Sequence, residues 1–300
     1  MNGRLTALLS FFAILLSASA LPNQHSHMTI KTLGYHEDAF FGKDPYISQL
    51  RAALDITIPE FGPYEIMLDM NQFDQVAEFE RLKNGDIDVI WSLTSTQRER
   101  EFIPIRFPLM RGLMGYRVLV INPQSAPWQK GSVGLDQLRS LVAIQGKGWP
   151  DVEILDQNGF IVGETPSISR AYALIKNQRF DFFPRSISEV FFEADKYQFE
   201  NGMGLIVAEN LGIHYPTAMF FFVSPNNIEL ATRFNIGMRT LEIQGLRQRF
   251  VSDNQYIQQI RLGLQNRLFY ELDNPFLTSE TIATLERCCS RQTLYTTLTN

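Results

Sequence analysis

The chain has 300 residues, with 27 Lys and Arg against 32 Asp and Glu, a formal net charge of −5, 45% hydrophobic residues and two cysteines. This apolar fraction excludes a disordered chain, and the mild acidity argues against nucleic-acid binding, which requires a basic face. Two cysteines are too few for a disulfide scaffold. The length predicts one large domain or two lobes of roughly 100–150 residues each.

Residues 1–20 have the pattern of a secretory signal peptide. Arg4 supplies the positive charge, residues 8–16 form an apolar core, and Ala18-Ser19-Ala20 fits the small-x-small cleavage rule. This core is too short to cross a bilayer, which requires about 20 residues, and no later apolar stretch is long enough. We therefore expect export to the periplasm, a mature chain that begins at Leu21, and no membrane-embedded segment.

The mature chain alternates predicted strands and helices, each identified from its apolar periodicity. The first unit has strands at 28–33, 64–68 and 87–91 and helices at 46–58 and 73–82, with Gly85 at the position of a glycine C-cap. This βαβαβ succession implies a parallel, doubly wound sheet. A second unit follows, with strands at 141–144 and 180–183 and a helix at 169–177.

One segment pattern occurs twice, 93 residues apart. Residues 82–90 and 175–183 both follow apolar-Lys-Asn-x-x-apolar-Asp-apolar-apolar, which describes a helix end, a tight turn and a buried strand. Either any such connection produces this pattern, or the chain contains two similar α/β lobes. Because ligands of open α/β sheets bind beyond the carboxyl ends of the strands, the residues to inspect are 91–98 and 184–188.

The sequence lacks the common catalytic motifs. It has no nucleophile elbow, no phosphate loop and no dinucleotide fingerprint, and His36-Glu37-Asp38 does not have the H-E-x-x-H spacing of a zinc site. We therefore expect no enzymatic activity, no metal and no cofactor.

The two cysteines, Cys288 and Cys289, are adjacent in the sequence. Ordinary disulfides join backbones that are further apart. Free thiols, a strained vicinal ring and an intermolecular link are the three alternatives that the sequence leaves open.

Residues 84–109 contain several short motifs in a fixed order. The first motif runs from Gly85 to Asp88 and leads into a predicted strand. The second, Ser95-Thr96-Gln97-Arg98, follows the pattern S-x-x-R, and the third is Phe107-Pro108-Leu109. This order resembles family 3 of the bacterial extracellular solute-binding proteins, in which G-x-[VI]-D is followed by T-x-x-R and F-S-x-P-Y. Weaker similarities at 116–121, 135–148, 171–183 and 220–245 extend the resemblance over most of residues 28–252.

The resemblance implies an α/β fold of the two-lobed periplasmic-binding-protein type II. Each lobe would be a doubly wound mixed sheet flanked by helices, and two hinge strands, 116–121 and 218–223, would join the lobes. The implied division is a signal peptide at 1–20, the first part of lobe 1 at 21–117, lobe 2 at 118–217, and a return to lobe 1 with a C-terminal tail at 218–300.

The resemblance also implies a function. The protein would close around a small polar or anionic solute, amino-acid-like or a carboxylate, and present it as a monomer to a membrane transporter. A ligand sensor for a membrane receptor is the alternative. An exported enzyme on the same fold is less favoured, because the residues beyond 252 are too few for a separate catalytic domain.

Several residues are implied as ligand contacts. In the family the T-x-x-R arginine binds the ligand carboxylate, since a guanidinium offers a planar bidentate fork. By resemblance Arg98 takes this role and Ser95 adds a hydrogen bond, with Arg100 as the rival if the register slips. Aromatic candidates for stacking on the ligand are Tyr35, Phe40, Trp91 and Trp149.

Arg185 departs from the family pattern. It stands where the amino-acid binders place an Asp that holds the ligand ammonium, and the glycine turn Gly146-Lys147-Gly148-Trp149 lacks the usual Thr. A cation there would repel an ammonium and attract an anion, which suggests a dianionic or carboxylate-rich ligand. In the competing interpretation Arg185 pairs with Glu189 one turn later and does not contact ligand.

Overall fold

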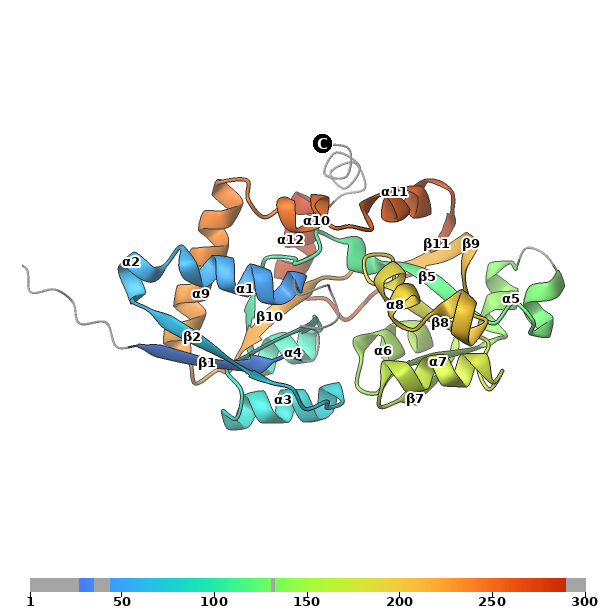
Figure 1. The fold of residues 1–300 in the computed structure, drawn as a ribbon, viewed down its shortest axis with the longest axis horizontal. Coiled ribbons are helices and arrows are strands. Elements are labelled where there is room, and N and C mark those ends of the chain that lie inside the picture. The colour runs from blue at the N-terminus through green and yellow to red at the C-terminus, as the bar shows by residue number, and fades with distance from the viewer. Residues whose placement is uncertain (1–26, 35–43, 131–132, 290–300) are drawn as a thin grey trace, which may run out of the picture.

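The computed structural model describes residues 27–34, 44–130 and 133–289 and shows two lobes, each built on one β-sheet (Figure 1). The strand order is β2-β1-β3-β10-β4 in the first sheet and β11-β9-β5-β8-β6-β7 in the second. Helices flank both sheets, so the predicted two-lobed α/β fold is confirmed. The predicted signal peptide lies outside the described residues, as do Tyr35 and Phe40.

The first sheet combines parallel and antiparallel pairs. β1 (Met28–Leu33) is parallel to β2 (Tyr64–Asp69) and to β3 (Val89–Leu93), and β10 (Met219–Val223) is antiparallel to β3 and to β4 (Ile103–Ile105). Every residue of β3 and β10 is buried, because helices cover this sheet. These helices are α1 (Pro45–Asp55), α2 (Ile58–Phe61), α3 (Gln75–Asn84), α4 (Thr96–Glu101), α9 (Ile228–Ile243) and α10 (Arg249–Ser252).

The second sheet is also mixed. β5 (Tyr116–Ile121) is antiparallel to β8 (Phe182–Ser186) and β9 (Ile206–His214), whereas β6 (Val142–Gly146) is parallel to β7 (Ile161–Thr165) and β8. Around it lie α5 (Leu135–Arg139), α6 (Pro150–Gln157), α7 (Ile168–Lys176) and α8 (Val190–Lys196).

The C-terminal tail takes part in both lobes. α11 (Ile257–Gln265) and β11 (Leu268–Glu271) follow α10, and β11 adds a parallel strand beside β9 in the second sheet. α12 (Ser279–Cys288) then returns to the first lobe. The domain boundaries stated above stay a prediction.

The duplicated sequence pattern has the same structure in both lobes. Gly85 and Gln178, 93 residues apart, both adopt left-handed backbone angles, with φ of +79° and +53°. Asp88 exchanges two 2.8 Å hydrogen bonds with the backbone of Lys31, and Asp181 makes the same pair with Val142 at 2.9 and 2.8 Å. The repeat therefore marks two similar α/β units, and its aspartates fasten a neighbouring strand.

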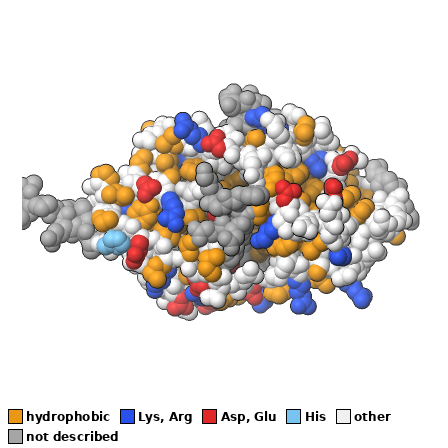
Figure 2. Space-filling view, viewed as in Figure 1, with side chains coloured by type: hydrophobic (Ala, Val, Ile, Leu, Met, Phe, Trp, Pro, Cys, Tyr) orange, Lys and Arg blue, Asp and Glu red, His pale blue; other side chains and the backbone are white. Residues whose placement is uncertain are grey.

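Charged side chains of both signs are interspersed with hydrophobic ones over the visible face of the molecule (Figure 2). No continuous basic surface appears on that face, as the small net charge of −5 leads one to expect. Within the described ranges, no helix has the length and apolar character needed to cross a membrane.

The crossing of α9 over α1 depends on Gly237. A Cβ at this position would lie 2.0 Å from the carbonyl oxygen of Ala53, which belongs to the backbone of α1 and cannot turn aside. We expect Gly237→Ala to lower the free energy of unfolding by about 2 kcal/mol, because overpacking outweighs the gain in helix propensity. Thr232→Ala, at an exposed position of the same helix, is the control and should change stability by less than about 0.5 kcal/mol. Urea unfolding checks both, and equal stabilities would contradict the expectation.

Candidate functional site

A cavity of about 630 Å³ lies between the two lobes. Aromatic side chains of both lobes line it, namely Tyr46, Phe73 and Trp91 from the first and Trp149, Phe192 and Tyr197 from the second. They are brought together because β3 ends at this edge of its sheet, α1 begins here, and α6 starts with Trp149 as its N-cap. The site therefore lies at strand ends, where ligands of α/β sheets bind.

Hydrogen bonds cross the cleft and join the lobes. Lys147 Nζ lies 2.8 Å from Asp74 Oδ2, and the Tyr46 hydroxyl donates to Glu189 Oε1 at 3.0 Å. Gly148 is so close to α3 that a Cβ on it would lie 2.7 Å from a methyl group of Val76, and its φ of +75° also favours glycine. The structure therefore shows the lobes closed on each other.

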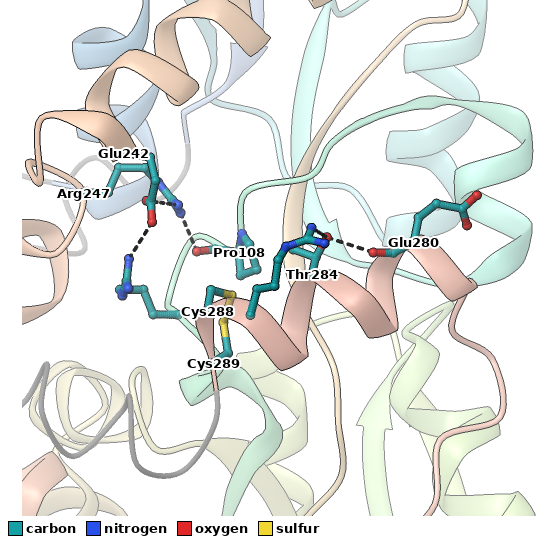
Figure 3. Close-up of a disulfide and its surroundings, with 9 residues drawn as sticks. Pro108, Glu242, Arg247, Glu280, Thr284, Cys288 and Cys289 are labelled. Carbon is teal, nitrogen blue, oxygen red and sulfur yellow. Dashed lines mark hydrogen bonds and ion pairs between the residues drawn. A yellow bond between two sulfur atoms is a disulfide. The ribbon is translucent and has the colours of Figure 1, made fainter.

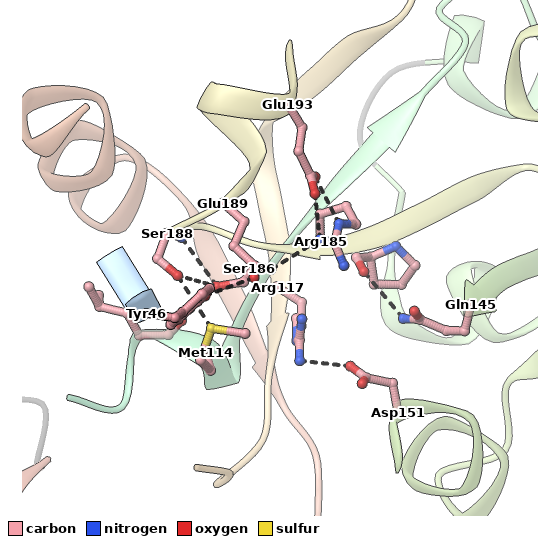
Figure 4. A network of polar contacts seen from close by, with 12 residues as sticks. Tyr46, Met114, Arg117, Gln145, Asp151, Arg185, Ser186, Ser188, Glu189 and Glu193 are labelled. Atoms are coloured by element: carbon pink, nitrogen blue, oxygen red, sulfur yellow. Dashed lines mark hydrogen bonds and ion pairs between the residues drawn. The ribbon is translucent and has the colours of Figure 1, made fainter. Parts of the chain in front are cut away.

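Arg185, on β8, is buried and fully engaged by carboxylates (Figure 4). Its Nε lies 2.8 Å from Glu193 Oε2, and its Nη2 lies 2.5 Å from Glu193 Oε1 and 3.1 Å from Glu189 Oε2. The guanidinium also lies over the ring of Trp149, 4.9 Å from its centroid. Burial alone would lower the pKa of Arg185, but the two carboxylates outweigh it and raise the pKa well above its usual value.

This geometry favours the interpretation in which Arg185 pairs with Glu189, and it adds Glu193 as a stronger partner. Tyr172 donates a further hydrogen bond to Glu193, at 2.5 Å. Because its charge is already balanced, Arg185 offers an anionic ligand much less than an isolated cation would. The charge of Arg185 therefore gives no reason to expect a dianionic ligand.

A second ion pair lies next to the first. Arg117, on β5, contacts Asp151 with 2.8 Å between Nη2 and Oδ1, and both side chains are 1% exposed. Tyr215 donates a hydrogen bond to the same carboxylate. Burial works against the charge of Arg117, but Asp151 raises the pKa of Arg117 above its usual value. Arg117 and Arg185 lie on the neighbouring strands β5 and β8, and both line the cavity.

Arg98 lies behind the cavity wall and binds protein groups. Its Nη1 donates to Ser92 Oγ and to the Leu93 carbonyl, both at 2.6 Å. Its Nη2 donates to Gln75 Oε1 at 2.8 Å and to the Gly148 carbonyl of the other lobe at 2.7 Å. Burial lowers the pKa of Arg98 to about 10, so the group stays charged at neutral pH.

Ser95 has a local structural task. It is the N-cap of α4, and its Oγ accepts the backbone N–H of Arg98 at 3.3 Å. The spacing S-x-x-R thus produces a helix cap in this chain. Neither Ser95 nor Arg98 lines the cavity, and the rival Arg100 is exposed on α4.

Trp91, Trp149 and Arg185 line the same cavity, and their contact with a ligand stays a prediction. Other wall residues were missed, among them Tyr46, Arg117, Asp151, Glu193 and Tyr197. A signal for Arg117 was present, since it is a charged residue in an otherwise apolar strand and a buried Arg needs a partner. Among the residues that the structure describes, no group of three or more His, Cys, Asp or Glu is placed to hold a metal ion.

The contact between Lys147 and Asp74 crosses the cleft at an exposed position, and it raises the pKa of Lys147 and lowers that of Asp74. Exposed ion pairs are weak and screened by salt, so Lys147→Met should lower the ratio of closed to open ligand-free protein measurably, by a factor of up to about five. Small-angle scattering should show a larger radius of gyration for this variant and for the parent protein at high salt. Lys83→Met, at an exposed position of α3, is the control, and identical profiles for all three would contradict the expectation.

No family model matches the sequence, and no curated protein matches it significantly. Solved structures do match. An ancestral arginine-binding protein bound to glutamine has a TM-score of 0.56 and 15% identity, covering 76% of this chain and 97% of that one. An amino acid ABC transporter substrate-binding protein from Streptococcus pneumoniae, bound to L-arginine, has a TM-score of 0.54 and 16% identity, covering 76% and 93%.

A sensor domain also matches. The periplasmic VFT2 domain of BvgS from Bordetella pertussis has a TM-score of 0.56 and 17% identity, covering 77% of this chain and 94% of that one. The chain therefore has the two-lobed fold that substrate-binding proteins share with periplasmic sensor domains. At these identities the similarity establishes the fold alone. The ligand and the function have to be inferred from the residues of the site.

Proposed function

We propose that this protein is a periplasmic solute-binding protein that closes around a small polar solute and presents it, as a monomer, to a membrane transporter. The observation that carries the proposal is the cavity of about 630 Å³ whose wall comes from both lobes. A ligand in such a cavity contacts both lobes only when they are closed, so binding favours the closed form by mass action. A transporter that recognises the closed form then distinguishes loaded from empty protein.

The wall indicates the chemistry of the solute. Arg117, Arg185 and Lys147 each have a carboxylate neighbour, so opposite charges alternate around the cavity. A zwitterion, such as an amino acid or a short peptide, suits a wall of balanced ion pairs better than a dianion does, because it brings no net charge that the wall would have to neutralise. The rings of Tyr46 and Trp91, 5.5 Å apart, offer a surface for an apolar or planar part of the solute. The volume lies in the usual range of small-molecule sites.

The test is a thermal-shift screen of the mature protein against amino acids, short peptides, dicarboxylates and sugars, followed by calorimetry on each hit. A true ligand raises the melting temperature as its concentration exceeds its dissociation constant. Trp149→Leu should weaken its binding at least tenfold. Trp128→Leu is the matched control, because Trp128 packs on Phe182 within the second lobe, away from the cavity. Equal affinities for the two variants, or no shift with any solute class, would overturn the proposal.

A sensor function is the second candidate, because sensor domains are among the structures with this fold. Both tasks need only closure on a solute, so the receiving membrane protein decides between them. Deleting the gene for this chain should abolish uptake of the identified solute if it serves a transporter. Unchanged uptake together with a lost transcriptional response to the solute would favour the sensor.

A further inference from the structure

The chain passes from β4 of the first sheet to β5 of the second through residues 106–115, and returns from β9 to β10 through residues 215–218. Beyond these two hinge connections, the C-terminal part of the chain crosses between the lobes twice more. After α10 it passes to the second lobe, where the Tyr256 hydroxyl donates to Asp195 Oδ2 at 2.8 Å and β11 joins the second sheet. It then returns to the first lobe, where Thr281 Oγ1 on α12 donates to Glu99 Oε1 at 2.6 Å. We call residues 253–289 the strap.

The strap ends in a disulfide between the neighbours Cys288 and Cys289 (Figure 3). Of the three alternatives left open by the sequence, the structure therefore shows the vicinal ring. Both cysteines are half-buried, and the backbone N–H of Cys289 closes the helix on the carbonyl of Leu285 at 2.9 Å. Such a bond is within reach of a reductant in solution, unlike one in a closed core.

The ring packs against the first hinge connection, residues 106–115, which we call the hinge segment. A Cβ on Gly112 would lie 2.9 Å from the Cβ of Cys289, so the two backbones are in close contact. Gly112 and its neighbour Arg111 both have left-handed backbone angles, with φ of +86° and +48°. Three residues later Gly115 accepts a hydrogen bond from Tyr215 N at 3.3 Å, where the two hinge connections touch.

Two residues at the end of α9 and in the turn that follows it also hold the hinge segment. Arg247 donates to the carbonyl of Pro108 at 2.6 Å and is paired with Glu242 at 2.7 Å, and Arg111 lies 3.4 Å from Glu242. Figure 3 shows Arg247 and Glu242 near Pro108, with the cysteine ring on the end of α12 close by. The hinge segment is therefore held both by charged groups and by the ring.

This disulfide is not explained by a contribution to the stability of the fold. A cross-link stabilises chiefly by closing a loop in the unfolded chain, and the effect grows with the length of that loop. Neighbouring residues close the smallest possible loop, so this bond adds little to the stability of the fold. The effect of the disulfide is local, because it fixes the backbone at Cys289, the residue that packs against Gly112.

We propose that the Cys288–Cys289 disulfide is a redox-sensitive brace on the hinge segment, opened by a dithiol reductant. In the exchange, one thiolate of the dithiol attacks a sulfur of the ring and forms a mixed disulfide, and its second thiol releases the product. The dithiol loses two electrons and two protons and becomes a disulfide, while Cys288 and Cys289 gain them and become two thiols. Opening the ring frees Cys289 from its fixed position against Gly112, and the hinge segment gains mobility. This inference does not depend on which solute the protein binds.

Hydrogen exchange of the oxidised and the dithiothreitol-treated mature protein tests the brace, with iodoacetamide labelling to count thiols. We expect two labelled thiols after mild treatment and at least threefold faster exchange at the amides of Leu113 and Gly115, which bond to Met110 and Gly112. Exchange in β1 and β2 should not change. The double variant Cys288→Ser, Cys289→Ser should exchange like the reduced protein and should not respond to dithiothreitol.

Two results would overturn the brace. One is equal exchange of the hinge segment in oxidised and reduced protein. The other is an equal acceleration across the whole of α12, which would mean that the ring holds its own helix and not the hinge. A failure of the solute screen leaves this test intact, because neither outcome involves a solute.

Discussion

Replacing Arg185 with Met should lower the free energy of unfolding by about 3–5 kcal/mol, because it leaves two buried carboxylates without their cation. Glu193 is bound through two guanidinium nitrogens and Glu189 through one, and all three side chains are at most 15% exposed. Urea unfolding at neutral pH measures the loss. Arg51→Met, at an exposed position of α1, is the control and should cost less than about 0.5 kcal/mol.

The loss should depend on pH in a definite direction. Burial raises the pKa of Glu189 in the folded protein even with Arg185 beside it. A carboxyl whose pKa is higher folded than unfolded destabilises the fold above the folded pKa, and this penalty disappears as the pH falls through the folded pKa towards the unfolded one. Without Arg185 that pKa rises further, so the deficit of Arg185→Met should shrink as the pH is lowered from about 8 to about 5. If the stability difference between Arg185→Met and the parent protein stays constant over this pH range, the pKa of Glu189 is not raised by the loss of Arg185.

Removing the Glu99 side chain should be almost as costly, at about 3 kcal/mol. This carboxylate is 1% exposed and accepts hydrogen bonds from the hydroxyls of Thr94, Thr278 and Thr281, at 2.6, 2.9 and 2.6 Å. Glu99→Ala leaves these buried hydroxyls without an acceptor, and each such group costs about 1–3 kcal/mol. Because two of the three come from the start of α12, hydrogen exchange should also accelerate throughout that helix.

The ion pair of Glu99 supplies its own control. Arg106 donates to Glu99 Oε2 at 2.7 Å, but its side chain is 37% exposed and water can replace the bond. Arg106→Ala should therefore cost less than about 1 kcal/mol. If Glu99→Ala and Arg106→Ala lower the free energy of unfolding equally, the threonine hydroxyls contribute less than we infer.

Seven strands and three helices could be predicted, because hydrophobic periodicity records local backbone geometry, whereas strands such as β7, β9 and β11 were missed. The strand at 28–33 and the glycine cap at Gly85 were both confirmed. Several boundaries moved. The strand predicted at 87–91 lies at 89–93, and the strand predicted at 180–183 begins at Phe182, because Asp181 uses its carboxylate and its N–H to hold Val142 of the neighbouring strand. A propensity pattern does not contain such a bond between distant residues.

The site was predictable mainly where its residues follow a strand end. Trp149 follows the end of β6 and lines the cavity, whereas Trp91 also lines it but lies inside β3. Arg98 also follows a strand end, but its acceptors include Gln75 and Gly148, which are distant in the sequence. The direction of a long side chain is therefore decided by groups that the fold brings to it.

By itself the sequence determined the alternation of strands and helices. The repeated pattern left a duplicated unit as one of two alternatives, and the two-lobed fold was implied by the family resemblance. Tertiary structure decided which charges meet: Arg185 with Glu193, Arg117 with Asp151, and Lys147 with Asp74 across the cleft. It also decided that Cys289 packs against Gly112 of the hinge. The physical reason is that periodicity follows from the local geometry of the backbone, whereas the partner of a buried charge depends on which distant segments share its low-dielectric surroundings.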